Sequence, residues 1–263
     1  MSADAARKAI FVTGAASGIG RATARLFAGE GWFVGCFDRS EHELETLKAE
    51  LGEANGIFRR LDVTDHDDFR AALDAFSAAS GGRMDVLHNN AGISAEGAFG
   101  DMPWETVMAV VNVNFIGVLF GIHAALPLLR ATPGSLCFTT SSSSAIFGIG
   151  GIAAYSATKH AVRGLTEALS IELKGTGVRA ADALPGLIDT GMVKPERKPY
   201  LPKEGMFRLI SPSEVAQAVW EAYHSDKIHW YVPPELAELD QQATASPERE
   251  RDKWAEMAVF NFK

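Results

Sequence analysis

The sequence predicts an α/β fold in which a doubly wound parallel sheet of about seven strands carries helices on both faces. Short apolar segments alternate along the 263-residue chain with segments of helical periodicity. Such alternation is typical of βαβ units and of a parallel sheet. The apolar segments are residues 9–12, 32–37, 56–61, 84–88, 135–140, 178–184 and 228–232.

Helix starts are marked where this scheme requires them. Ser40 precedes Glu43 by three residues, and Ser211 precedes Glu214 in the same way, with Pro212 directly after the serine. A serine followed three residues later by glutamate is a capping box, and proline is favoured at the first helical position. We expect helices to begin at both places.

Composition favours one catalytic domain that extends over residues 1–263. Hydrophobic residues make up 47% of the chain, which is enough for a full core. The formal net charge is −8, so no broad basic surface is available to bind the phosphates of a nucleic acid. The seven histidines show no metal-ligand spacing. We therefore expect neither a nucleic-acid partner nor a metal.

Several features favour a cytoplasmic protein. Residues 1–8 contain no apolar run of the kind that directs secretion, and Cys36 and Cys137 lie far apart in apolar segments, as expected for unpaired thiols. Residues 109–129 are long and apolar enough to span a membrane. Because this segment also contains two asparagines, a histidine and a proline, we expect it in the protein interior or at a subunit interface.

A glycine-rich turn follows the first apolar segment and reads Thr13-Gly14-Ala15-Ala16-Ser17-Gly18-Ile19-Gly20. Glycines between a strand and a helix let backbone amides approach a pyrophosphate, and the helix N-terminus adds partial positive charge. The turn therefore predicts a dinucleotide site, with an ordinary tight turn as the alternative. The residues expected there are Gly14, Ser17, Gly18, Ile19 and Gly20.

Asp38 and Arg39 at the end of the second strand bear on the choice of dinucleotide. A carboxylate at this place can accept hydrogen bonds from the adenosine ribose, which favours NAD(H). A 2′-phosphate about 4 Å away would be repelled by about 4 kcal/mol at an effective dielectric constant near 20. Arg39 has the opposite effect, since its guanidinium could bind that phosphate. We favour NAD(H), and NADP(H) stays open.

Tyr155 and Lys159 are spaced i, i+4 and share one face of a predicted helix. An ammonium near a tyrosine favours the phenolate and lowers its pKa. Such a tyrosine is a proton donor and acceptor suited to alcohol/ketone interconversion. Ser142 lies thirteen residues before Tyr155 at a strand end, where its hydroxyl could bind a substrate oxygen. The serines on either side of it leave the register open.

These motifs together resemble the signature of the short-chain dehydrogenase/reductase family: TGxxxGxG, Asn-Asn-Ala-Gly at 89–92, a serine, and YxxxK. The resemblance extends from about residue 8 to residue 232. It implies a Rossmann-type fold, NAD(P)(H) as cofactor, and hydride transfer between that cofactor and an alcohol/ketone pair. It also implies that Tyr155 is the general acid/base, that Lys159 holds the nicotinamide ribose and lowers the pKa of Tyr155, and that Ser142 orients the carbonyl.

The resemblance assigns further residues by their position. Asn114 matches the helical asparagine whose backbone carbonyl holds a water of the proton relay, and Asn112 is the nearby competitor. The cofactor residues implied in the same way are Asp62 and Val63 at the adenine ring, Asn90, Ala91 and Gly92 beside the central sheet, and Pro185, Gly186, Ile188 and Thr190 at the nicotinamide end.

Substrate selection is expected in three segments that flank the predicted reacting centre, residues 93–98, 145–154 and 187–210. The last is expected to be a mobile loop with one short helix. Its five basic and three acidic residues give weak support for an anionic substrate. The middle segment instead predicts a pocket for a hydrophobic, uncharged alcohol or ketone, lined by Ala145, Ile146, Phe147, Ile149 and Ile152.

Residues 233–263 form the C-terminal tail. Ser246 and Pro247 begin a predicted amphipathic helix with Trp254, Met257 and Phe260 on its apolar face. Family members are commonly dimers or tetramers, so we expect a homo-oligomer in which this tail could pack on a neighbouring subunit.

Two other classes of function remain. A non-catalytic dinucleotide sensor would need only the glycine turn, so the intact set of Ser142, Tyr155 and Lys159 argues against it. An epimerase or dehydratase that retains its cofactor would share the Tyr155 and Lys159 spacing. Its families carry an additional C-terminal substrate domain for which this chain has no corresponding segment.

Overall fold

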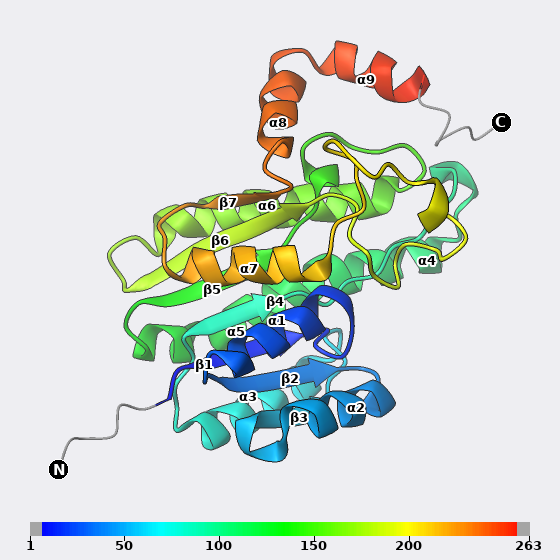
Figure 1. The fold of residues 1–263 in the computed structure, drawn as a ribbon. Helices are drawn as coiled ribbons and strands as arrows, with labels where there is room; N and C mark the ends of the chain where they lie inside the picture. Colours follow the sequence, from blue (N-terminus) through cyan, green and yellow to red (C-terminus); the bar gives the residue numbers. More distant parts are fainter. Residues whose placement is uncertain (1–6, 257–263) are drawn as a thin grey trace.

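The computed structural model describes residues 7–256, and it confirms the α/β fold with one parallel sheet (Figure 1). The seven strands of this described part follow the order β3-β2-β1-β4-β5-β6-β7. The order reverses between β1 and β4, the switch point at which doubly wound sheets bind ligands. The strands are β1 (Ala9–Thr13), β2 (Phe33–Asp38), β3 (Gly56–Arg60), β4 (Val86–Asn89), β5 (Ser135–Thr140), β6 (Val178–Pro185) and β7 (His229–Val232).

Each strand lies within two residues of its predicted segment. Every residue of β1 and of β5 is buried. This double-sided burial is expected where helices cover both faces of a parallel sheet, and it is why these strands are continuous apolar runs in the sequence.

Helices cover the two faces of the sheet, as Figure 1 shows. The cluster of buried side chains on one face includes residues of α1, α2 and α7, and the cluster on the other includes residues of α3, α5 and α6. The helices are α1 (Gly18–Gly29), α2 (Glu41–Leu51), α3 (His66–Ser80), α4 (Trp104–Val111), α5 (Gly117–Ala131), α6 (Ala153–Glu172), α7 (Pro212–Tyr223), α8 (Leu236–Ala245) and α9 (Pro247–Glu256).

Aromatic side chains fill much of both cores. Phe11 of β1 stacks on Phe37 of β2 at 4.1 Å between ring centroids, and its ring meets the edge of Phe76 at 5.3 Å. On the other face, Phe27 meets Trp32 at 4.9 Å. Offset and edge-to-face aromatic pairs add to the stabilisation from burial. The strand ends that carry the predicted site therefore project from a densely packed sheet.

The long apolar segment forms a continuous helix over Trp104–Ala131, longer than the predicted 109–129. A π-helical turn, Asn112–Ile116, joins α4 to α5. By length and composition this helix could cross a membrane. An 18-residue stretch of it has a mean hydropathy of 1.9, and 39% of that stretch is buried in the protein. One such helix is weak evidence, because core helices of folded proteins share these properties.

Both predicted helix starts are present, with different capping bonds. The Ser40 hydroxyl accepts from the Glu43 amide at 3.4 Å. In a complete capping box the Glu43 side chain would accept from the Ser40 amide. Here the Oδ1 of Asp38 accepts from that amide instead, at 3.0 Å. The Ser211 hydroxyl accepts from the Ser213 amide at 3.3 Å, not from Glu214.

The C-terminal region contains more helix than predicted. Helix α9 begins at Pro247, as expected, but the tail also contains α8, which the sequence did not predict. Met257 and Phe260 lie outside the described residues. Loop 187–210 contains a short 3-10 turn, Lys198–Tyr200, where one short helix was expected.

Candidate active site

The glycine turn lies at the carboxyl end of β1, beside the switch point. Gly14 and Gly18 have φ angles of +64° and +50°, a conformation that other residues rarely adopt. A Cβ on Gly20 would lie 2.1 Å from the Gly14 carbonyl oxygen, and one on Gly18 would lie 2.9 Å from Thr190 Cγ2. These contacts require glycine, and they place Thr190 over the turn.

The start of α1 fits a dinucleotide pyrophosphate. Ser17 is the N-cap residue of α1, and its side chain makes no capping hydrogen bond. The first amides of a helix have no partners within that helix, so those of α1 are left for an anionic ligand. Together with the bare glycine backbone, this is the donor set that a dinucleotide-binding turn needs.

Asp38 is fixed beside the same turn. Its Oδ2 accepts from the Ala16 amide at 3.0 Å, and its Oδ1 accepts from the Ser40 amide at 3.0 Å. Arg39 is exposed next to it. Two backbone amides therefore hold the carboxylate where an adenosine ribose lies in dinucleotide-binding folds.

The segment after β4 is joined to the glycine turn by hydrogen bonds. Asn90 Nδ2 donates to the Thr13 carbonyl at 3.0 Å and to the Gly14 carbonyl at 3.3 Å. Thr13 Oγ1 accepts from the amides of Asn90 and Ala91, each at 3.0 Å. Thr13 was not predicted as a site residue. A hydroxyl residue directly before the first glycine of the turn is the sequence signal that could have found it.

Tyr155 and Lys159 lie one turn apart near the start of α6. Lys159 Nζ lies 5.4 Å from the centroid of the Tyr155 ring and donates to the Thr140 carbonyl at 2.8 Å. Burial lowers the pKa of Lys159 from 10.5 to about 8. Burial also raises the pKa of Tyr155, while a hydrogen-bonding contact with Ser142 has the opposite, smaller effect. The net shift of Tyr155 is therefore upward, opposite to the predicted lowering by Lys159, because desolvation of the phenol dominates.

The serines at 141–144 have different neighbours. Ser142 makes the hydrogen-bonding contact with Tyr155, and its Oγ accepts from the Ser144 amide at 3.1 Å. Ser141 Oγ donates instead to the Lys159 carbonyl at 3.0 Å. The structure thus places Ser142 beside the phenol, at the register that the thirteen-residue spacing predicts.

Asn114 is fully buried in the π-helical turn, a feature often found at functional sites. Its side-chain amide pairs with the backbone of Ile93, with both hydrogen bonds at 2.8 Å, and its Nδ2 reaches Thr158 Oγ1 of α6 at 3.3 Å. The carbonyl of Asn112, the competing candidate, accepts from the Gly117 amide. The Asn114 side chain joins the segment after β4 to α6, and the role implied for its backbone carbonyl stays a prediction.

The other predicted cofactor residues lie at strand ends. The Gly186 amide donates to the Val232 carbonyl at 2.8 Å, and Ile188 is buried and forms a bridge with Ile210. A Cβ on Gly92 would lie 3.4 Å from Asn114 Oδ1 and 3.7 Å from Lys159 Nζ, which places this glycine next to two of the predicted catalytic residues. The remaining residues are Asp62 and Val63, which follow β3, and Pro185, which ends β6.

The apolar segment after Ser142 begins with two residues that are almost fully buried. Ala145 and Ile146 are 2% and 8% exposed and pack in a cluster with Leu236 and Leu239 of α8. These two residues are therefore almost fully buried in the cluster that includes α8, and their role in lining a pocket stays a prediction. Met102 and Tyr155 both pack against a separate buried cluster that includes Val107 and Val110 of α4.

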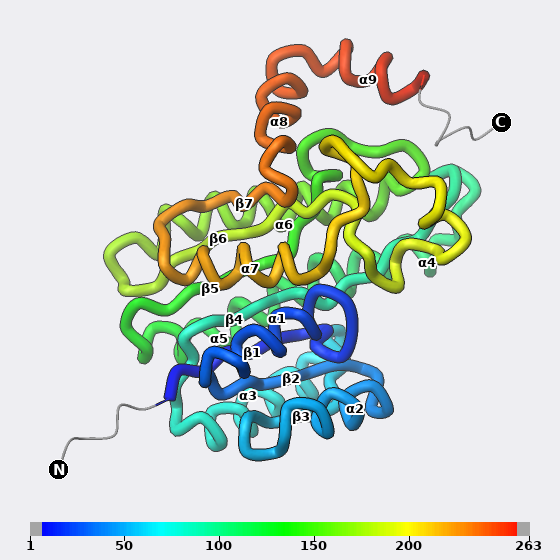
Figure 2. Tube along the Cα trace, viewed as in Figure 1, coloured from blue at the N-terminus to red at the C-terminus, as the bar shows by residue number. Residues whose placement is uncertain are grey.

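Loop 187–210 lies next to the segment that precedes α4 (Figure 2). Lys194 and Arg197 bind the two carboxylate oxygens of Glu96 at 3.2 and 3.0 Å. Two more basic residues of the loop are paired, Lys198 with Asp189 and Arg208 with Glu235. Because four of the five basic residues have acidic partners, the loop gives no support to an anionic substrate.

Comparison with known proteins places this geometry in a family. A model of the short chain dehydrogenases matches residues 8–201. The chain is 36% identical over 221 residues to a 3-oxoacyl-(acyl-carrier-protein) reductase of Thermotoga maritima, covering 81% of this chain and 88% of the relative. It is 33% identical over 213 residues to the meso-2,3-butanediol dehydrogenase of Serratia marcescens, with coverage of 80% and 84%.

A solved structure agrees over nearly the whole chain. A short chain dehydrogenase/reductase from Burkholderia phymatum in complex with NAD superposes with a TM-score of 0.82 at 25% identity, covering 93% of this chain and 95% of the other. The glycine turn, the segment after β4 and the tyrosine–lysine helix all lie within the region that the family model matches. This chain belongs to the short-chain dehydrogenase family.

Proposed function

We propose that this protein is an NAD(P)-dependent oxidoreductase that interconverts a secondary alcohol and its ketone. The observation that carries the proposal is the meeting of Ser142, Tyr155 and Lys159 at the carboxyl edge of the sheet, where the glycine turn also lies. The relatives from Thermotoga and Serratia are named as a reductase and a butanediol dehydrogenase, which supports this class of reaction.

Predicted binding groups are available for three parts of the dinucleotide. The glycine turn and the first amides of α1 would bind the pyrophosphate, and Asp38 would bind the adenosine ribose. Ile188 and Thr190 would meet the nicotinamide end, since Thr190 lies over Gly18. When bound, the dinucleotide supplies or accepts the hydride.

The side chains of this protein would manage the proton and the substrate oxygen. Because burial raises the pKa of Tyr155, its hydroxyl is protonated at neutral pH, which is the form that donates a proton to a ketone oxygen during reduction. Ser142 would donate a second hydrogen bond to the same oxygen. With a pKa of about 8, Lys159 carries a positive charge at pH 7 and favours the phenolate that remains after the proton is transferred.

NAD(H) is the preferred dinucleotide in this proposal. Rotating the Asp38 carboxylate away, to let Arg39 bind a 2′-phosphate, would break two hydrogen bonds to backbone amides. If the carboxylate stays in place, a phosphate about 4 Å away is repelled by about 4 kcal/mol. The complex of the Burkholderia relative with NAD supports the same choice.

The test is absorbance of the reduced nicotinamide with a panel of ketones and alcohols, run with each phosphate form of the cofactor. We expect substrate-dependent turnover with one form at least tenfold faster than with the other, a difference of about 1.4 kcal/mol. Equal rates with both forms would contradict the role of Asp38. Dinucleotide binding without turnover over the panel would support a sensor, and product formation without net change in NAD(P)H would support an epimerase or dehydratase.

We also infer a cytoplasmic homo-oligomer in which the helix Trp104–Ala131 contributes to an interface. Its inner side packs closely in the protein, because a Cβ on Gly121 would lie 2.7 Å from the Phe69 ring of α3. Its outer side exposes Trp104 at 64% and Ile116 at 36%. Light scattering on the purified protein should give the mass of a dimer or tetramer without detergent, and a monomer would contradict the inference.

A further inference from the structure

Arg163 extends the catalytic face of α6 beyond Tyr155 and Lys159. It lies four residues after Lys159, so the three side chains follow one face of the helix. Its side chain is only 19% exposed. The guanidinium binds Asp240 of α8 through two hydrogen bonds, from Nη1 at 3.0 Å and from Nη2 at 2.7 Å. This two-pronged arginine–carboxylate pair has a fixed orientation.

Arg163 also contacts the turn that carries Ser142. Its Nη1 donates to the carbonyl of Ala145 at 3.2 Å. The amide of Ala145 in turn donates to the Ser142 carbonyl at 2.9 Å. The helix that carries Tyr155 is therefore joined, through Arg163, to the turn that carries Ser142. This link is separate from the direct contact between Ser142 and Tyr155.

Helix α8 supports the same turn from outside. Leu236 and Leu239 of α8 belong to the same buried hydrophobic cluster as Ala145. Asp240 of the same helix accepts from the Tyr231 hydroxyl of β7 at 2.5 Å as well as from Arg163. The C-terminal helix thus fixes the carboxylate that orients the guanidinium.

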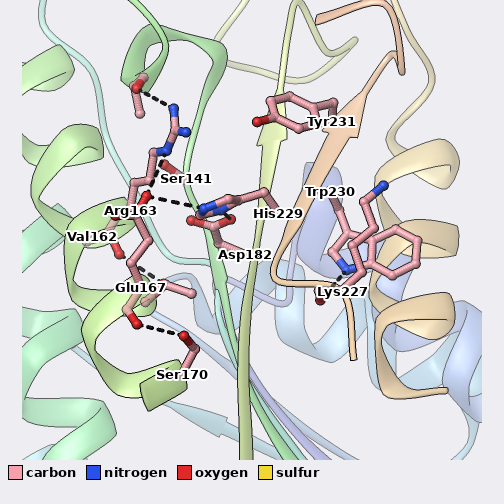
Figure 3. A network of polar contacts seen from close by, with 12 residues as sticks. Ser141, Val162, Arg163, Glu167, Ser170, Asp182, Lys227, His229, Trp230 and Tyr231 are labelled. Atoms are coloured by element: carbon pink, nitrogen blue, oxygen red, sulfur yellow. Dashed lines mark hydrogen bonds and ion pairs between the residues drawn. The ribbon is translucent and has the colours of Figure 1, made fainter. Parts of the chain in front are cut away.

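A second group of titratable residues contacts Arg163 along α6 (Figure 3). Its Nε donates to Glu167 at 3.2 Å, and the same carboxylate lies 3.2 Å from His229 Nε2. His229 Nδ1 lies 2.7 Å from Asp182, which is fully buried in β6. Figure 3 shows His229 between Glu167 and Asp182, so the network extends from α6 into the sheet.

We propose that Arg163, held by Asp240, is a positioning residue that sets the place of Ser142 relative to Tyr155. The proposal rests on the proposed function, in which Ser142 binds the substrate oxygen. Loss of the guanidinium would free the Ala145 carbonyl and let the serine turn shift, whereas the glycine turn and Asp38 have no contact with this network. Turnover should therefore fall while dinucleotide affinity stays constant.

The variant Arg163→Met keeps the apolar part of the side chain and removes the guanidinium. Arg25→Met is the matched control, since Arg25 binds Glu50 on the opposite face of the sheet. We expect Arg163→Met to lower kcat by about tenfold or more, because small misplacements of catalytic groups reduce rates strongly. The dissociation constant of the dinucleotide should stay within twofold, and Arg25→Met should behave as the parent protein.

Combination with Ser142→Ala separates positioning from a general loss of structure. If Arg163 acts through Ser142, Arg163→Met has no further effect on kcat in the Ser142→Ala background. Multiplicative effects of the two substitutions would overturn the proposal. Should Arg163→Met fold poorly because Asp240 is left without its partner, Arg163→Met/Asp240→Asn removes both charges and tests the same point.

Hydrogen exchange gives a readout that does not depend on turnover. Amides of residues 142–146 should exchange faster in Arg163→Met than in Arg25→Met, with unchanged exchange in the glycine turn. Unchanged exchange at 142–146 would overturn the positioning role even if no substrate is found. Absence of turnover in the parent protein, with the expected exchange pattern, would instead contradict the proposed function alone.

Discussion

Replacing Lys159 by methionine should stabilise the protein while it abolishes turnover. Burial lowers the pKa of this lysine from 10.5 to about 8. At about 1.4 kcal/mol per pKa unit, keeping the buried ammonium charged at pH 7 costs about 3 kcal/mol of folding stability. The hydrogen bond from Nζ to the Thr140 carbonyl returns about 1 kcal/mol. Lys159→Met, measured without dinucleotide, should therefore gain about 2 kcal/mol.

The dependence on pH gives the sign of this effect. Below pH 8, Lys159 is protonated in both the folded and the unfolded protein, and the full destabilisation is present. Between about pH 8 and 10.5 the unfolded chain binds more protons at this residue, so its contribution to stability rises with pH. Lys159→Met lacks this contribution, so its advantage over the parent protein should shrink across that interval.

Urea unfolding of both proteins at pH 7, 8, 9 and 10 measures the difference directly. The comparison of the two proteins cancels the titration of all groups that are unaffected by the substitution. A variant that is less stable than the parent protein at pH 7, or a difference that stays constant up to pH 10, would refute the reasoning.

Four further outcomes are expected. Tyr155→Phe should lower kcat by about 10² to 10⁴, as expected for loss of a general acid/base, with dinucleotide affinity nearly unchanged in fluorescence titration. Gly18→Ala should weaken dinucleotide binding at least tenfold in the same titration, because its Cβ would meet Thr190 at 2.9 Å. Asp38→Ser should shift the NADP(H)/NAD(H) ratio of kcat/KM at least tenfold toward NADP(H). Phe69→Ala, at a fully buried ring, should lower the free energy of unfolding by about 3–5 kcal/mol in urea.

Each of these outcomes has its own control or contrary result. Gly81→Ala is matched to Gly18→Ala, since Gly81 has a φ of +67° but open space around it, so dinucleotide binding should be retained. Full turnover in Tyr155→Phe would remove Tyr155 from the chemistry. An unchanged cofactor ratio in Asp38→Ser would place selectivity elsewhere. A loss below about 1 kcal/mol in Phe69→Ala would mean that the core relaxes around the missing ring.

Most of the fold could be predicted because its signals are local. Buried parallel strands are continuous apolar runs, and their order along the chain follows from the alternation with helices. The π-helical turn could not be found this way, since Gly117, which directly follows it, packs against distant backbone: a Cβ on Gly117 would lie 3.0 Å from the Val63 carbonyl oxygen. Helix α8 does have a sequence signal, the apolar spacing of Leu236, Leu239 and Ala243, but the two prolines that precede it favour a turn.

The groups that we propose to react could be located in the sequence for the same reason. Tyr155 and Lys159 are one helical turn apart, and the glycine turn is a single short motif. The contacts that hold them in place could not be predicted, because they join residues that are distant in the sequence. Thr13 and Asn90 are 77 residues apart, and so are Arg163 and Asp240. Only the folded sheet brings these pairs together.

The protonation of the site depends on burial, which no motif encodes. The spacing of Tyr155 and Lys159 correctly indicates that the two groups are neighbours. A prediction from this spacing considers only how the lysine charge affects the tyrosine pKa, and it leaves out the effect of burial. Desolvation shifts both groups toward their neutral forms, lowering the pKa of Lys159 and raising that of Tyr155. The folded protein therefore presents a protonated phenol beside a lysine that is charged at pH 7 at the expense of stability. That destabilisation is itself a reason to expect the lysine to act in the chemistry, because an apolar side chain at this position would favour folding.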